Sequence, residues 1–439
     1  MAMPMVTMSL PVNIVMTAMV AKAFVLPKAT IGLISAMPFV GNFLQIFATP
    51  FLTKWRPPKT ITVLAASMHL VTWIGLGIFL PWIPRDDPTA AGHWLIAWFL
   101  LSSCFAAVAG VSWNAWILEW VPGRLRGKFF GRRNGALQVS TLTFLLIAGW
   151  AIARWNYAMP MFQLIIAGAA FMRVFSLHLQ WQSPTREPRE APTGSLPIVD
   201  QLRVLAGSRS LLLFIVFGAV WAFAANCFGP FYSIFMFEQI GFSAFNVGVV
   251  YTLSQLGGAL SLPAWGQLLD RYGNKPVMIL SLILWQTSNF IWCFLTPQHQ
   301  VLLYMLAAWG GITSAGFVLG QFTILMRLLP VEAKNLAIGV NLAFISLVAA
   351  LAPIMGGQIL GWALGRWSDA LAVYHWCFVL QPVLALGGAF LLLRVREPAA
   401  SPFSSVVGAM RNIRTLSGVL GLSFLVNYVF FKVPRKPTP

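Results

Sequence analysis

The stretch VPGRLRG at residues 121–127 has a counterpart in the stretch LPVEAKN at residues 329–335. Each stretch joins two long apolar segments. One constant offset in numbering relates three residue pairs: Pro122 and Pro330, Arg126 and Lys334, Gly131 and Gly339. The chain is therefore predicted to be one six-helix unit that is used twice.

The composition requires a lipid environment for most of the chain. Hydrophobic residues make up 58% of the 439 positions and charged residues only 9%, and the mean hydropathy is +0.77. A soluble protein of this size carries far more polar and charged residues, because they cover its surface. A membrane-spanning helix takes about 20 mostly apolar residues, so twelve spans fit with room for loops.

The twelve predicted spans form two sets of six. The first set is 4–26, 31–51, 60–83, 92–119, 131–153 and 157–179, and the second is 210–236, 244–268, 276–296, 300–326, 336–363 and 371–394. Helices pair their backbone groups locally, and the Gly, Ala and Leu content favours them over barrel strands. We expect an all-α membrane protein with two parallel six-helix repeats at 1–180 and 210–394, a linker at 181–209 and a tail at 395–439.

The tail contains a further apolar segment at 416–431. A thirteenth span there would place the basic end of the chain outside the cell, against the charge rule for membrane proteins. An interfacial amphipathic helix with Arg411 and Arg414 on its polar side is the preferred interpretation.

The net charge of +18 raises the question of nucleic-acid binding, and its distribution argues against it. With the predicted spans, 24 of the 29 Lys and Arg residues fall on one side of the membrane. An excess of basic residues in cytoplasmic loops orients membrane proteins. We therefore expect a protein of the cytoplasmic (inner) membrane with both termini in the cytoplasm. The five on the other side are Lys22, Lys28, Arg85, Arg154 and Arg366.

The loop after the eighth predicted span reads GQLLDRYGNK at residues 266–275. It resembles the G-x-L-x-D-R-x-G-R-K signature of the major facilitator superfamily. The resemblance covers about residues 4–394 and implies a carrier whose two halves rock against each other around a central solute site. It also implies that the loop is a latch governing this alternation, with Gly266, Asp270, Arg271 and Gly273 as gating residues.

Each gating residue of this loop has an expected physical role. Gly266 lets helices approach closely, and Gly273 permits the tight turn. Asp270 is expected to accept from the N-terminal amides of a neighbouring helix and to pair with an arginine. The equivalent first-half loop, LTKWRPPK at 52–59, keeps only basic character. Glu119 and Arg126 are added as gating candidates because they lie at the repeated loop, although they also fit a role in helix ends and topology.

In this superfamily the first, fourth, seventh and tenth helices line the central cavity. The matching polar and aromatic side chains are predicted to bind the solute, and the alternative is that amides join helices and rings form interfacial belts. The predicted solute-binding residues are Asn13, Trp113, Asn114, Trp116, Trp221, Asn226, Tyr232 and Gln321.

The eleven acidic residues are all predicted to lie in loops or near helix ends. His69, His178 and His375 lie in apolar segments and are also placed near span ends. Proton-driven carriers use an ionisable group buried in mid-membrane, so a conventional proton-coupling site and a charged solute are not expected. Aromatic rings with a few amides favour a neutral polar ring such as a sugar or a nucleoside.

Other functional classes remain as alternatives. An enzyme is not expected, because no HExxH, GxSxG, CxxC or phosphate-loop pattern occurs. Neither a cofactor nor a metal is expected, and the predicted partners are a small solute and membrane lipids, with a monomer as the functional unit. An efflux carrier for lipophilic compounds fits the same features. So does a scaffold or receptor that no longer transports, given the degraded first-half loop.

Overall fold

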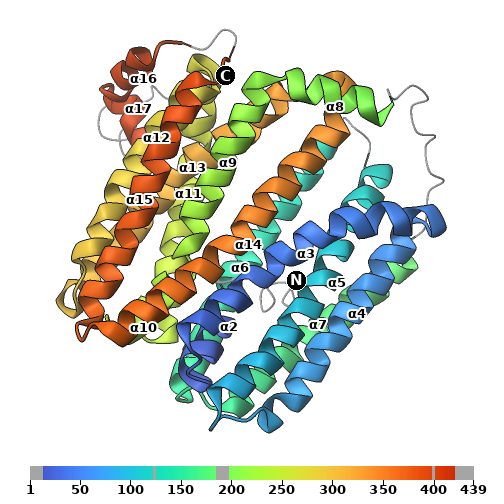
Figure 1. Ribbon diagram of the computed structural model, residues 1–439, viewed down its shortest axis with the longest axis vertical. Coiled ribbons are helices and arrows are strands. Elements are labelled where there is room, and N and C mark those ends of the chain that lie inside the picture. Colours follow the sequence, from blue (N-terminus) through green and yellow to red (C-terminus); the bar gives the residue numbers. More distant parts are fainter. Residues whose placement is uncertain (1–12, 122–124, 184–196, 398–400, 421–439) are drawn as a thin grey trace, which may run out of the picture. The chain divides into compact units, whose positions relative to one another are not determined.

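The computed structural model describes residues 13–121, 125–183, 197–397 and 401–420 (Figure 1). All regular elements among these residues are helices. The chain forms two compact units, each built from separate stretches of sequence. The first unit takes Met1–Gln201, Ala222–Gly248 and Glu332–Cys377, and the second takes Leu202–Trp221, Val249–Val331 and Phe378–Pro439.

Most helices of the first unit come from the first half of the chain. Those from the first half are α2 (Ile14–Ala18), the π-helix η1 (Met19–Ala23), α3 (Lys28–Trp55), α4 (Pro58–Phe79) with the short η2 (Leu80–Trp82), α5 (Pro88–Trp120), α6 (Arg126–Arg154) and α7 (Met159–Gln182). The second half adds α10 (Phe231–Glu238) and α14 (Lys334–Arg366), which follows η6 (Val331–Ala333). Within this unit, α3 packs along both α5 and α14, and α4 packs against α5 and α7.

The second unit contains α12 (Asn274–Asn289) with η4 (Phe290–Phe294), and α13 (Gln300–Leu328) preceded by η5 (Pro297–His299). It also contains α16 (Phe403–Met410) and α17 (Ile413–Val419). Four helices cross or adjoin the unit boundaries: α8 (Ile198–Gly207), α9 (Arg209–Cys227), α11 (Ala244–Tyr272) and α15 (Ala370–Arg394). Within the unit α12 packs against α13, and α16 lies beside α12 (Figure 1).

Each predicted span has a helical counterpart. Ten helical segments of the described residues are long and apolar enough to cross a membrane. The eighth predicted span corresponds to α11, a helix of 29 residues with more polar positions. The first corresponds to the apolar segment Ile14–Ala23, and its beginning lies outside the described residues. The all-α membrane fold is confirmed, and twelve spans fit this arrangement.

The crossing of α3 and α14 depends on small residues (Figure 1). A Cβ atom added to Gly32 would stand 2.1 Å from the carbonyl oxygen of Pro353 and 3.1 Å from the Cα of Gly357. The distance to the Pro353 oxygen is shorter than real Cβ contacts, so the helices approach this closely only because Gly32 has no side chain. Small residues are what allow close helix crossings within membranes.

The seventh predicted span is not one continuous helix. α9 ends at Cys227, and α10 begins at Phe231 after the turn Phe228-Gly229-Pro230. Pro230 has no N–H group for the helical ladder, and the amide of Phe231 instead donates to the carbonyl of Phe228 at 2.9 Å. Hydropathy is uniformly high across this stretch and therefore does not reveal the break.

The predicted linker at 181–209 contains a helix that hydropathy did not predict. α8 covers Ile198–Gly207, with Asp200 in its first turn and Leu205 buried. An acid in the first turn interacts favourably with the positive end of the helix. The rest of the linker between 184 and 196 lies outside the described residues.

Candidate functional site

The turn between α11 and α12 has the backbone geometry that the sequence predicts. Gly273 connects the two helices with φ +93° and ψ 163°. This region of backbone space is open to glycine and strained for residues with a side chain. The expectation that Gly273 permits a tight turn is confirmed.

The carboxylate of Glu397 binds the N–H groups in the first turn of α12. Its two oxygens accept hydrogen bonds from the backbone N–H groups of Asn274, at 3.1 Å, and Lys275, at 2.7 Å. The side-chain amide of Asn274 donates to the same carboxylate at 2.7 Å. The first N–H groups of a helix have no partner within the helix, and a buried negative charge satisfies them well.

The Glu397 carboxylate also forms an ion pair with Arg327 at the end of α13, with 3.1 Å between Nη1 and Oε1. The side chain of Glu397 is 2% exposed and that of Arg327 is 57% exposed. Thr323 of α13 donates to the Asn274 side-chain oxygen at 2.8 Å. The start of α12, the end of α13 and the segment after α15 are therefore joined by one polar network.

Two expectations for the 266–275 loop do not match the structure. Asp270 is exposed, and its carboxylate forms no ion pair within the described part of the chain; the contacts expected of it are made by Glu397. A Cβ atom at Gly266 would meet only Leu319, at 3.9 Å, which is ordinary contact. A close approach involving α11 occurs instead where Gly311 of α13 meets the Ser254 carbonyl. The gating role of Asp270 and Gly266 remains a prediction.

The other predicted gating residues are only partly described. Arg271 is exposed, with its guanidinium carbon 5.3 Å from the centre of the Tyr272 ring. The backbone of Glu119 lies in the last turn of α5 and that of Arg126 begins α6. The side chains of Glu119 and Arg126 lie outside the described part of the structure.

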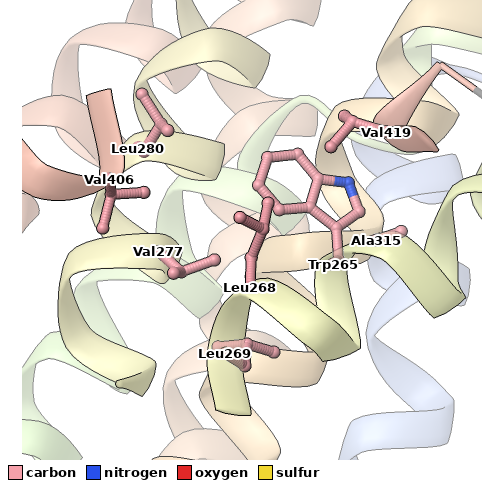
Figure 2. Close-up of a cluster of buried hydrophobic side chains, with 8 residues drawn as sticks. All are labelled: Trp265, Leu268, Leu269, Val277, Leu280, Ala315, Val406 and Val419. Atoms are coloured by element: carbon pink, nitrogen blue, oxygen red, sulfur yellow. The ribbon is translucent and has the colours of Figure 1, made fainter. Parts of the chain in front are cut away.

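The segment after α15 is anchored to the same turn by apolar contacts. Val406 of α16 is fully buried and Val419 of α17 is 2% exposed. Figure 2 shows both valines in a cluster with side chains of α11, α12 and α13 around the indole of Trp265. The amide of Ser401 also donates to the carbonyl of Tyr272 at 2.9 Å.

The tail was expected to place an apolar face against lipid. Its described helices α16 and α17 instead bury valines against other helices of the protein. Arg411 is exposed, as predicted, while the side chain of Arg414 and residues 421–439 lie outside the described part. The helix predicted at 416–431 is described only for its first residues, where α17 ends at Val419.

Four of the predicted solute-binding residues belong to α5 or to the position just before α2. Asn13 is fully buried, and its side-chain oxygen caps α2 by accepting from the amide of Met16 at 3.1 Å. Trp113 of α5 is half-buried, and the Arg133 guanidinium carbon lies 4.2 Å from its ring centre. Asn114 is exposed. Trp116 is buried, with no hydrogen-bond partner for its indole N–H among the described residues.

The seventh predicted span contributes Asn226 and Tyr232, both half-buried. The Asn226 side-chain amide donates to the Ala222 carbonyl of its own helix at 2.7 Å. Tyr232 lies in the first turn of α10, directly after the break at Pro230. The break thus separates these two residues onto different helices.

Trp221, the remaining candidate of the seventh span, belongs to an aromatic cluster of the second unit. Its ring centre lies 4.5 Å from that of Phe317 and 5.1 Å from that of Trp285. Phe317 is fully buried, whereas Trp221 and Trp285 are partly exposed. Gln321 lies on α13 one helical turn after Phe317 and is half-buried. Sequence reasoning missed Trp285 and Phe317, because residue type alone does not distinguish a binding aromatic side chain from one that only packs.

A polar cluster in the first unit was also missed. Lys28, at the start of α3, forms an ion pair with Glu238, at the end of α10. Their side chains are 15% and 26% exposed. The hydroxyl of the fully buried Tyr374 donates to the other Glu238 oxygen at 2.9 Å. Both charged residues were placed at span ends, which is correct, but nothing local in the sequence pairs them.

One histidine lies deeper than predicted. His69 was placed near the end of its span, and it lies in the middle of α4, 5% exposed. Its Nε2 atom has no hydrogen-bond partner among the described residues, and neither does Nε of Arg173 on the neighbouring α7. The described apolar helices α4 and α7 therefore do contain basic ionisable groups, His69 and Arg173.

Comparison with known proteins identifies related sequences. The model of the Major Facilitator Superfamily matches residues 2–226 and 222–435. An uncharacterized MFS-type transporter, YfiU from Bacillus subtilis (strain 168), is 27% identical over 180 residues, which cover 40% of this chain and 32% of that protein. The efflux pump dotC of Dothistroma septosporum is 27% identical over 155 residues, covering 35% and 24%. The matched segments thus span less than a third of these relatives.

Solved structures of similar fold cover nearly the whole chain. A D-xylose-proton symporter has a TM-score of 0.69 at 12% identity, covering 88% of this chain and 95% of that one. A mutant of the nucleoside transporter NupG has a TM-score of 0.66 at 13% identity, with the same coverage. A bacterial homolog of the lysosomal transporter Spinster has a TM-score of 0.62 at 14% identity, covering 93% and 95%. At these identities the likeness concerns the fold.

Proposed function

Because the chain belongs to the Major Facilitator Superfamily, we propose that it is a secondary carrier that moves a small organic solute by alternating access. A neutral polar molecule such as a sugar or a nucleoside is the favoured solute. The protein has this role in a cytoplasmic (inner) membrane, as a monomer with both termini in the cytoplasm. Residues 1–180 rock against residues 210–394.

The preference for a neutral polar solute is supported by the ring cluster of Trp221, Trp285 and Phe317. The rings lie within 6.0 Å of one another, centre to centre. Trp221 and Trp285 keep part of their surface exposed. Aromatic faces stack on the flat apolar faces of sugars and nucleobases without requiring a charge on the ligand. Gln321, one turn beyond Phe317, adds an amide that pairs with a hydroxyl or a base edge.

The polar network at the α11–α12 turn is the proposed latch. Glu397 holds the start of α12 and is bound to Arg327, whose largely exposed side chain can leave the carboxylate without unfolding a helix. Ion pairs that form in one conformer and break in another are a common basis for such switching. Asp270 and Arg271 remain exposed in this structure and are therefore free to serve the other conformer.

The ion pair of Lys28 and Glu238 is the proposed closing contact at the opposite membrane face. Lys28 belongs to the first sequence repeat and Glu238 to the second. The pair must break when the repeats separate at that face. Both side chains are partly buried, at 15% and 26% exposed, and the hydroxyl of Tyr374 donates to the same carboxylate, which holds Glu238 in place for the pair.

The second candidate is efflux of lipophilic compounds. It is favoured by one relative, the efflux pump dotC of Dothistroma septosporum, which shares 27% identity with this chain over 155 residues. Aromatic clusters also bind flat apolar compounds, so the ring cluster is compatible with both solute classes. A scaffold or receptor that does not transport is the third candidate.

The test begins with thermal unfolding of the purified protein in the presence of neutral sugars, nucleosides and lipophilic cations. A compound that binds the folded state raises the unfolding temperature with its concentration. The compound that stabilises is then tested for flux in proteoliposomes. Trp221→Ala should weaken its binding roughly tenfold or more, because stacking of a ring contributes about 1–3 kcal/mol. Trp376→Ala, which removes a tryptophan that is 79% exposed, is the matched control.

The outcomes separate the candidates. Stabilisation by a sugar or nucleoside, lost in Trp221→Ala and kept in Trp376→Ala, supports the proposed function when the same compound also shows flux in proteoliposomes. Stabilisation by lipophilic compounds alone supports efflux. A compound that binds but shows no flux in proteoliposomes supports the scaffold, and equal binding by both tryptophan variants refutes the ring cluster as the site.

A further inference from the structure

A cavity of about 520 Å³ in the second unit is lined by three arginines that the proposed transport cycle does not use. Arg209 begins α9, Arg394 ends α15, and Arg396 follows two residues later. Two hydroxyls and three leucines complete the wall, namely Ser208, Ser210, Leu211, Leu213 and Leu328. The cavity therefore combines positive charge, hydrogen-bonding groups and an apolar side.

The cavity lies at the level where the apolar spans end. Arg209 is the first residue of the candidate span Arg209–Glu238, and Arg394 is the last residue of Ala370–Arg394. The hydrocarbon core of a bilayer is flanked by a polar region that holds the lipid headgroups. Residues at the ends of spans face this region, so the three guanidinium groups are at headgroup level.

The positive charge of the cavity is not offset by a neighbouring acid. Among the residues that the structure describes, no carboxylate is paired with Arg209, Arg394 or Arg396. Glu397 is adjacent to Arg396 in sequence, but its carboxylate is bound to the α12 amides. The amide of Leu212 donates to the Ser208 carbonyl, so the earlier N–H groups of α9 add the positive end of that helix.

A second cavity of about 750 Å³ shares Arg394 and Arg396 and serves as an internal comparison. Its wall also contains Glu397 and Lys275, and Lys275 donates its side-chain protons to the Leu393 and Val395 carbonyls. The carboxylate in this wall makes it less attractive to an anion. The cavity with Arg209 is thus the better anion site of the two.

We propose that the cavity of Arg209, Arg394 and Arg396 binds a phosphate-bearing anion, with the phosphodiester headgroup of an anionic membrane lipid as its source. Guanidinium groups bind phosphate oxygens by paired, charge-assisted hydrogen bonds. The leucines on the wall contact the glycerol and upper acyl atoms of a lipid, which free phosphate lacks. Basic pockets between transmembrane helices suit such headgroups on physical grounds.

The test measures thermal unfolding of the full-length, delipidated protein in neutral detergent, with three separate additions. These are phosphatidylglycerol, phosphatidylcholine with the same acyl chains, and inorganic phosphate. The triple variant Arg209→Gln/Arg394→Gln/Arg396→Gln is compared with the parent. The variant Arg154→Gln/Arg366→Gln is the matched control, because it removes arginines from span ends that do not line the cavity.

The expected result is stabilisation of the parent by phosphatidylglycerol, at concentrations at which phosphatidylcholine has little effect. In the triple variant the concentration for half-maximal stabilisation should rise at least about tenfold, and in the control variant it should be unchanged. The single variants Arg209→Gln and Arg396→Gln should each show a smaller rise. They keep the test decisive if the triple variant does not fold.

Three results would overturn the proposal. One is equal stabilisation by the two lipids together with no response to phosphate. Another is an unchanged response to phosphatidylglycerol in the arginine variants. The third is an equal loss in the control variant, which would show a general effect of net charge. Stabilisation by inorganic phosphate as large as that by phosphatidylglycerol, lost in the triple variant, supports the anion site and identifies free phosphate as its source.

Discussion

Glu397 and Asn274 are joined twice, because one carboxylate oxygen accepts from both the backbone N–H and the side-chain amide of Asn274, at 3.1 and 2.7 Å. The two residues are 123 positions apart. This contact fixes the segment after α15 to the first turn of α12. In the family signature the position of Asn274 is usually basic, and here the amide serves as both donor to Glu397 and acceptor from Thr323.

Replacing Glu397 with Gln should lower the stability of the protein and change its transport rate. The substitution removes the negative charge from a buried site that holds two backbone N–H groups and Arg327. A hydrogen bond to a charged group contributes about 1.5–3 kcal/mol, so the unfolding temperature should fall clearly. Asp270→Asn, at an exposed position, should leave that temperature unchanged and slow flux only. Equal unfolding temperatures for Glu397→Gln and the parent would contradict the role given to Glu397.

Gly273→Ala should be destabilising, because the turn holds this residue at φ +93°. A side chain in that region costs about 1–3 kcal/mol of strain. Gly266→Ala is the control seven residues earlier, within α11, since its Cβ would have only an ordinary contact with Leu319 at 3.9 Å. The unfolding temperatures of the two variants can be compared directly, and a larger loss for Gly266→Ala would refute this view of the turn.

The ion pair of Lys28 and Glu238 should show measurable coupling in a double-mutant cycle. Lys28→Met and Glu238→Gln each break the pair, and together they should cost less than the sum of their separate effects. With side chains 15% and 26% exposed, we expect a coupling free energy of about 1 kcal/mol. Additive effects on stability would show that the pair contributes nothing. A Lys28→Glu/Glu238→Lys exchange that restores flux would support its place in the cycle.

Gly32→Val should prevent the close crossing of α3 and α14. Even its Cβ atom would stand 2.1 Å from the Pro353 carbonyl oxygen, so the backbones must separate. Overpacking of this kind costs typically about 1–3 kcal/mol. Gly110→Val is the control, because no atom lies within 4 Å of a Cβ at Gly110. Crosslinking between cysteines placed at Met37 and Ala350, which share one buried cluster, would report the separation directly.

Val406→Ala should destabilise the second unit by about 2 kcal/mol, because Val406 is fully buried in the cluster around Trp265. Val331→Ala removes the same atoms at a position that is 88% exposed and should change little. Thermal unfolding of the two variants tests whether the segment after α15 is an integral part of the unit. Equal effects would show that α16 is only loosely attached.

The sequence alone was sufficient to predict the membrane-spanning segments and their repetition. The length and hydropathy of a span are local properties, and each predicted span corresponds to a helical segment. The Gly273 turn was also predictable, because a positive φ depends on residue type at one position. The break at Phe228-Gly229-Pro230 and helix α8 were missed, since hydropathy averages over such short features.

The identity of the acid at the start of α12 was decided only by the tertiary structure. The loop signature directed attention to Asp270, whereas the N–H groups of α12 are bound by Glu397 from 123 residues away. Lys28 and Glu238, 210 residues apart, are paired in the same way by packing. Local sequence determines which segments become helices, because backbone pairing and transfer to lipid are local. Which charges meet depends on how the helices pack, and no local pattern encodes that.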